Sequence, residues 1–268
     1  MAMYALALSP LTELIRDKCK QVWYADDATG CDTFEKLLIW FNELKDKGPS
    51  YGYFPKPEKC ILLTKPDRVE RAREVFLGSR VKVETEGSKD AEKVKKNELE
   101  INSQGTRHLG AALGTLDFKH LYVMRKVRSW VYSVQQLALI AATQPHAAFA
   151  AFTHCLQSQW TFVSRAMTDI SDLFQPLEDA IRLALLPALV HREVNDLERE
   201  LLSMPARYGG LGMTNPTQSC TAANVNSLCV TEPLVDLIMS QSRVRSQKRD
   251  KKKRKKQKKI DIHRYISI

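Results

Sequence analysis

Two adjacent aspartates, Asp26 and Asp27, have the residue types and spacing that best suit chemistry in this chain. They follow an apolar segment that ends at Tyr24 and lie within a turn predicted over residues 25–30, which closes at Gly30. Adjacent strand residues point to opposite faces, but a tight turn can bring two carboxylates to one side. Mg²⁺ suits such a pair because it takes carboxylate oxygens together with substrate phosphates. Two such ions would activate an attacking hydroxyl and stabilise a leaving pyrophosphate.

The same aspartates also fit a plain polar hairpin turn, in which aspartate is common. A Tyr-x-Asp-Asp match arises by chance in roughly 2–3% of chains of this length. The tetrapeptide alone therefore does not decide between a turn and a metal site, and the surrounding elements must be considered.

The residues around the aspartates predict an α+β first half. Residues 1–15 are apolar on all sides and predict a buried helix, and 20–24 predict a strand whose hairpin partner lies near Cys31. A helix is predicted from Asp32, with Glu35 three residues later as in a capping box. Further extended segments are predicted at 51–54, 59–64, 81–85 and 107–113, with a short helix from 67 to 76.

The second half predicts helices only. Helical periodicity runs from Asp117 to His191 and again over 196–204. Before it, residues 88–105 hold four Lys and four acidic residues, which predicts a solvated insertion. After it, Gly209–Gly212 predicts a turn that allows close backbone approach.

The positive charge of the chain is concentrated near its end. Residues 243–259 hold twelve Lys or Arg and one Asp, which gives this segment a net charge of +11. The whole chain carries +10, so residues 1–242 are close to neutral. This run, which includes Lys251, Lys252, Lys253, Arg254, Lys255 and Lys256, predicts a disordered tail that contacts nucleic acid or directs nuclear import. Six scattered cysteines predict reduced thiols and no zinc module. No membrane span is expected, and the location is nuclear or cytoplasmic.

Tyr24-Ala25-Asp26-Asp27 resembles the catalytic hairpin of reverse transcriptases, and other segments resemble the same family in the expected order. Residues 1–15 are similar to the helix that follows the template-gripping motif. Gly52–Pro55 with Lys59 resembles the next palm motif, and His108-Leu109-Gly110 resembles the primer-grip strand. Residues 204–212 are similar to a segment downstream of the thumb in polymerases of non-LTR retrotransposons.

The resemblance implies a domain organisation: a partial palm over residues 1–115 with an insertion at 88–105, thumb-like helices over 116–216, and a linker with a basic tail over 217–268. The expected fold class is therefore α+β, with an antiparallel palm sheet and helices, then an all-helical region, then a disordered tail. RNA template and DNA primer are the implied partners.

The resemblance also implies roles for individual residues. Asp26 and Asp27 correspond to Mg²⁺ ligands, and Lys59 corresponds to the residue thought to protonate pyrophosphate. For Lys59, a solvated lysine at a strand edge is an equally good interpretation. Nucleic-acid contacts are implied for Tyr24, His108, Leu109 and Gly110.

The family also uses a third aspartate, on an upstream strand that no residue here matches, as well as fingers and a gripping motif. We therefore expect the isolated chain to be inactive as a polymerase, and an exposed palm edge to promote self-association. An alternative from another class is a non-enzymatic nucleic-acid-binding protein that uses the basic tail. A fragment whose product continues upstream is a third possibility.

Overall fold

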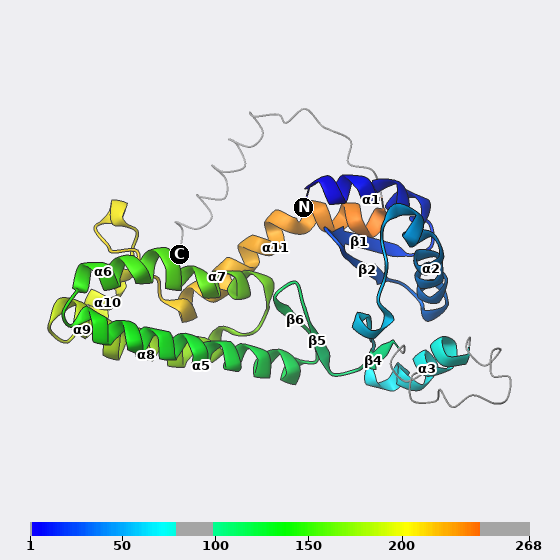
Figure 1. Cartoon of the computed structure of the whole chain (residues 1–268). Helices are drawn as coiled ribbons and strands as arrows, with labels where there is room; N and C mark the ends of the chain where they lie inside the picture. Colours follow the sequence, from blue (N-terminus) through cyan, green and yellow to red (C-terminus); the bar gives the residue numbers. More distant parts are fainter. Residues whose placement is uncertain (1, 79–98, 242–268) are drawn as a thin grey trace.

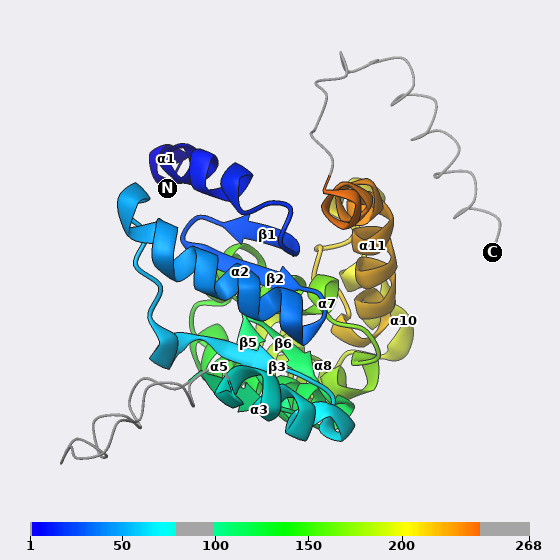
Figure 2. The same cartoon turned by 90° about the vertical axis from the view of Figure 1, so that its right-hand side faces the viewer.

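The computed structural model describes residues 2–78 and 99–241. Over these residues the chain is a mixed α+β protein that is mostly helical, with small sheets, so this coarse fold class is confirmed. Figures 1 and 2 show a smaller part around α1, α2 and the β1–β2 hairpin, and a larger helical part around α5 to α9. Helix α11 runs from the larger part to the smaller one.

The smaller part is built on helices α1 (Ala2–Leu14) and α2 (Phe34–Lys47) and on strands β1 (Lys20–Tyr24) and β2 (Asp27–Cys31). Apolar side chains from both helices and from the segment before β1 form its core, because each helix buries one apolar face. The buried members are Leu8, Leu11, Ile15, Cys19, Trp40 and Leu44.

Two details of these helices differ from the sequence predictions. Helix α1 was expected to be buried all round, but Met3 and Leu6 are 80% and 67% exposed because only one face meets the core. The N-cap of α2 is Thr33 instead of Asp32. The Asp32 carboxylate accepts a hydrogen bond from the Thr33 backbone N–H at 2.9 Å, so it contacts the chain just before the helix.

A single antiparallel palm sheet is not formed among the described residues. The strands make three separate two-stranded sheets, and β3 (Ile61–Leu63) pairs in parallel with β4 (Glu100–Asn102). Helix α3 (Val69–Gly78) lies between β3 and β4 in sequence. The predicted solvated insertion is thus wrong for residues 100–102, whose backbone groups pair with β3. The strand predicted at 81–85 lies outside the described residues.

The segments on either side of these strands also differ from the sequence predictions. Residues 51–54 were expected to be extended, but Gly48–Tyr51 form a 3-10 helix that ends at Gly52, whose φ of 74° suits glycine. The single strand expected over 107–113 is a second hairpin, of β5 (Gly105–His108) and β6 (Ala111–Gly114). Its two-residue turn, Leu109-Gly110, has positive φ at both positions, which is typical of a tight hairpin turn.

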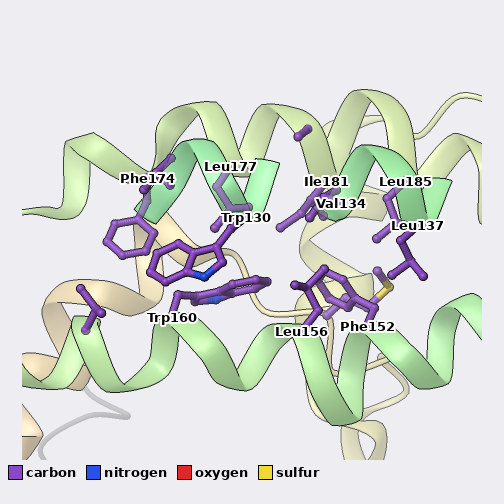
Figure 3. Packing of buried hydrophobic residues seen from close by; sticks show 14 of the residues in the cluster. Trp130, Val134, Leu137, Phe152, Leu156, Trp160, Phe174, Leu177, Ile181 and Leu185 are labelled. Atoms are coloured by element: carbon purple, nitrogen blue, oxygen red, sulfur yellow. The ribbon is translucent and has the colours of Figure 1, made fainter. Parts of the chain in front are cut away.

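The larger part is a helical bundle, as the periodicity predicts. Its helices are α5 (Leu116–Ala141), α6 (Pro145–Ala151), α7 (Gln157–Ala166), α8 (Gln175–Ala180) and α9 (Leu186–Val190). Trp130 of α5 stacks on Phe174, with ring centroids 6.1 Å apart, and Trp160 lies 6.0 Å from Trp130. Figure 3 shows these three rings packed together, with the aliphatic side chains of Leu177, Ile181 and Val134 beside them. Aromatic burial of this size dominates the stability of a core.

Two turns of the bundle are wound as π-helix. Phe152–Leu156 joins α6 to α7, and Ile181–Leu185 joins α8 to α9. The buried residues Phe152, Leu156 and Trp160 follow one another at intervals of four. A π turn holds more residues than an α turn, so this spacing keeps the three side chains on one face.

Helix α10 (Asp196–Ser203) carries the most deeply buried ion pair of the described residues. Arg199 donates to both carboxylate oxygens of Glu178, with N–O distances of 2.6 and 2.7 Å, and to the Met213 carbonyl at 2.7 Å. The two side chains are only 5% and 6% exposed. This pair joins α8, α10 and the chain before α11.

The glycine turn after α10 lets two backbone segments touch. A Cβ atom at Gly210 would lie 2.1 Å from the Met204 carbonyl oxygen and 2.5 Å from that of Leu201. The close approach of backbone predicted for Gly209–Gly212 is therefore confirmed at Gly210, whereas a Cβ atom at Gly209 or Gly212 would meet nothing within 4 Å.

Helix α11 (Pro216–Ser240) occupies residues that the sequence analysis assigned to a linker, so that assignment is wrong for 217–240. The Asn215 side chain caps the helix by accepting from the N–H groups of Thr217 and Gln218, and Pro216 takes the first position, where proline is favoured. Buried Cys220 and Asn224 hold its first half on α7.

Candidate nucleic-acid and metal site at the β1–β2 hairpin

The aspartate pair lies at the tip of the β1–β2 hairpin. Tyr24 pairs with Asp27, which leaves Ala25 and Asp26 as a two-residue turn. Ala25 has φ of 56°, the positive value that the first turn position of such hairpins requires. Both carboxylates are exposed, as is Tyr24. Gly30, predicted as a turn, lies inside β2 because the pairing continues to Cys31.

A single buried amide fixes the base of this hairpin. Gln21 donates from Nε2 to the Thr12 carbonyl of α1 at 2.8 Å. Its Oε1 accepts from the indole N–H groups of Trp23 at 3.0 Å and Trp40 at 2.9 Å. Gln21 therefore ties α1, β1 and α2 together, and it satisfies two indole donors that burial would otherwise leave unpaired. No pattern in the sequence marks Gln21 for this role.

Tyr53 supports the hairpin from a different segment. Its ring meets Trp23 edge to face, with centroids 5.2 Å apart. Burial, together with smaller contributions from negative charge on Cys60, Tyr4, Asp27 and Asp26, raises the pKa of Tyr53 to about 12. The hydroxyl therefore stays protonated beside the aspartates at neutral pH. Tyr53 lies in the predicted palm motif, but only the fold shows its contact with the hairpin.

The raised pKa of Tyr53 predicts a loss of stability in alkali. The ordinary value is 10.0, so between pH 10 and 12 the unfolded chain releases this proton while the folded chain keeps it. The free energy of unfolding then falls as pH rises, by at most about 1.4 kcal/mol per pH unit. Urea titrations should show that the free energy of unfolding falls less steeply with pH in Tyr53→Phe than in the original chain. An exposed control, Tyr132→Phe, should behave like the original chain, and equal slopes in all three proteins would contradict the prediction.

The second hairpin lies against the first. Thr29 Oγ1 of β2 is 3.4 Å from His108 Nε2 at the end of β5. The Tyr122 hydroxyl of α5 donates to the Gly110 carbonyl at 2.6 Å, so the helical bundle holds the turn of this hairpin in place. Leu109 is 47% exposed at the same turn. Of the predicted contact residues, His108 is thus positioned next to the aspartate hairpin, and Gly110 is held by the helical bundle.

Lys59 is placed differently from the aspartates. It ends a 3-10 turn, Pro57–Lys59, and its side chain is exposed. No hydrogen bond or ion pair joins Lys59 to Asp26 or Asp27 in the part of the chain that the structure describes. Residues 251–256 lie outside the described residues.

The donor set at the hairpin fits a hard cation only in part. Two exposed carboxylates suit Mg²⁺, which commonly takes one or two carboxylates plus water and phosphate oxygens. Among residues 2–78 and 99–241, however, no three His, Cys, Asp or Glu side chains gather closely enough to hold a metal ion.

Comparison of the chain with protein-family models, curated proteins and solved structures found no match. Within the described ranges, no helix combines the length and apolarity needed to cross a bilayer. The functional interpretation therefore depends on the hairpin, its neighbours and the motif that they carry.

Proposed function

We propose that this chain is the palm and thumb part of a reverse transcriptase, with Asp26 and Asp27 as its remaining metal ligands. The observation that carries the proposal is the Tyr24–Asp27 hairpin, whose two-residue turn presents both carboxylates at one exposed end. The contact between Thr29 and His108 supports it, because the segment that resembles a primer grip lies beside that hairpin.

In this proposal each residue has a distinct task. Bound Mg²⁺ would supply activation of the primer hydroxyl and neutralise the leaving pyrophosphate. Tyr24, 62% exposed, offers an aromatic surface for a base, as stacking sites for single strands do. Leu109 and Gly110 form a turn, held by the Tyr122 hydroxyl, against which primer backbone can lie. Lys59, if nucleic acid brings the pyrophosphate to it, would donate the proton.

Catalysis by this chain alone is not part of the proposal. No third aspartate of the chain matches the family's upstream ligand, and loss of one such electrostatic element typically costs about 10²–10³ in rate. Positioning of the nucleotide, which the fingers provide in the family, is a further large part of phosphoryl transfer.

Primer extension on a poly-rA/oligo-dT template with Mg²⁺ tests the proposal. We expect no extension by the purified chain, for the reasons above. Extension that disappears in Asp26→Ala/Asp27→Ala would show a complete site at these residues and contradict the expected inactivity. Extension that persists in that double variant would contradict the assignment of the aspartates.

Binding of the same primer–template separates the proposal from its alternative. The palm and thumb should keep measurable affinity after residues 243–259 are deleted, although the salt dependence of binding should become weaker. Complete loss of binding at low salt would instead support a nucleic-acid-binding protein that acts through its basic tail.

A further inference from the structure

Strand β1 has an outer edge on the side away from β2. Tyr24 and Asp27 flank a two-residue turn and are paired, so they exchange the two backbone hydrogen bonds that close the hairpin. Bonded and non-bonded pairs alternate along the ladder, and Val22 therefore also bonds toward β2. The backbone N–H and C=O groups of Gln21 and Trp23 consequently point to the outer edge.

The end of α11 covers part of this edge and bonds to one of its four outward-facing backbone groups. The helix packs against β1 (Figure 1), and Gln241 Nε2 donates to the Gln21 carbonyl at 3.0 Å. In the residues that the structure describes, the outward-facing backbone groups of Trp23 have no hydrogen-bond partner. The palm edge that the sequence analysis expected to be exposed is thus partly covered by a helix from the other end of the chain.

The part of α11 that reaches β1 is weakly anchored. No residue from Val225 to Ser240 is buried, and Leu228, Val230 and Leu234 are 54%, 77% and 57% exposed. Pro233 also lies inside this half of the helix, where it removes a backbone hydrogen bond. Segments with few buried apolar contacts open locally at low cost.

We propose that the outer edge of β1 is a docking surface for the same edge of a second copy of this chain, and that the end of α11 leaves the edge when the copies pair. Antiparallel pairing about a two-fold axis at Val22 brings Gln21 of one copy opposite Trp23 of the other. All outward-facing backbone groups of both residues are then satisfied. The Gln241 side chain lies on the outward-facing Gln21 carbonyl, at the place where the second strand would pair, so the pairing displaces it.

The side chains of the edge suit a second copy. In this register Val22 faces Val22 of the second copy, and Lys20 faces its Tyr24. Val22 and Tyr24 are 40% and 62% exposed in the single chain. Cross-strand pairs of β-branched residues, and of a cation with an aromatic ring, stabilise paired strands. Lys20 of each copy also comes close to the turn that carries Asp26 of the other copy. Opposite charges therefore meet at both ends of the paired strands.

The first experiment releases the edge in the full chain. Gln241→Ala removes the covering hydrogen bond from both copies, and we expect the dimer association constant to rise about 25-fold, about 5-fold for the one ordinary hydrogen bond that each copy no longer gives up. Sedimentation equilibrium at high salt measures it, because the +11 charge of residues 243–259 repels a second copy at low salt. A Gln241→Ala chain that associates no more than the original chain overturns the role of α11.

The second experiment blocks the edge. In the Gln241→Ala background, Val22→Lys places two ammonium groups opposite each other at the two-fold axis, and the protein should return to monomer. Val22→Thr keeps a β-branched side chain and should still dimerise. Circular dichroism confirms that each variant is folded. A Val22→Lys protein that dimerises as strongly as its parent overturns the docking surface. Neither readout depends on polymerase activity, so the result is separate from the proposed function.

Discussion

Replacing Arg199 with alanine is expected to lower the free energy of unfolding by about 3–5 kcal/mol. The substitution leaves the Glu178 carboxylate buried, 6% exposed, without the guanidinium that pairs with both of its oxygens. It also removes the donor to the Met213 carbonyl. Leaving a buried charge without a partner costs far more free energy than the intact pair contributes to stability. The substitution therefore destabilises the folded state by more than the pair stabilises it.

Chemical denaturation followed by circular dichroism measures this loss. Arg73→Ala is the matched control, because Arg73 pairs with Glu70 on the surface, where both side chains are more than half exposed. That change should cost less than about 1 kcal/mol. Arg199→Lys should also destabilise the chain, since a single ammonium cannot reproduce the two parallel hydrogen bonds. Equal stability of Arg199→Ala and Arg73→Ala would contradict the importance of the buried pair.

Trp130→Ala is the second substitution with a large expected effect, a loss of about 3–5 kcal/mol. The Trp130 side chain is 4% exposed and lies between Phe174 and Trp160 in the bundle core (Figure 3). Removal of the indole leaves a cavity that three helices line, and these helices cannot close it without moving their own backbones.

Tyr132 provides the control for this substitution on the same helix. It lies two positions further along α5 and its side chain is 63% exposed. Tyr132→Ala should therefore change the free energy of unfolding by less than about 0.5 kcal/mol. Thermal unfolding of both variants measures the difference. A Trp130→Ala protein as stable as Tyr132→Ala would mean that the bundle core can be repacked at little cost.

The local parts of this fold could be predicted from sequence. Apolar periodicity identified the long helices after Leu116, and the pattern around Lys20–Tyr24 gave the first strand with its bounds as the structure has them. These elements are determined mainly by residues that lie close to one another in the sequence. Helix α11 was missed although Asn215-Pro216 is a favourable helix start, because its second half is apolar on several sides and lacks the single stripe that marks an amphipathic helix.

The site was predictable only as far as its motif extends. The aspartate hairpin was predicted as a hairpin because its strand and turn residues are contiguous, but the turn expected over residues 25–30 was too long, since β2 begins at Asp27. The buried amide of Gln21 joins residues from three elements, and a glutamine in a strand carries no signal for such a role. The contact between Thr29 and His108 connects positions 79 residues apart. Contacts of this range follow from tertiary packing, which no local pattern encodes.

The two π turns have a consequence for the ancestry of the bundle. A π turn is equivalent to one extra residue wound into a regular helix, so a relative with an uninterrupted α-helix at Phe152–Leu156 or Ile181–Leu185 would be shorter by one residue there. Beyond that point its buried positions would be shifted by one against those of this chain. Alignments of the two would then need a single-residue gap inside a helix, a position where gaps are usually penalised. Distant relatives of this bundle are therefore better sought by three-dimensional superposition than by ungapped helical patterns.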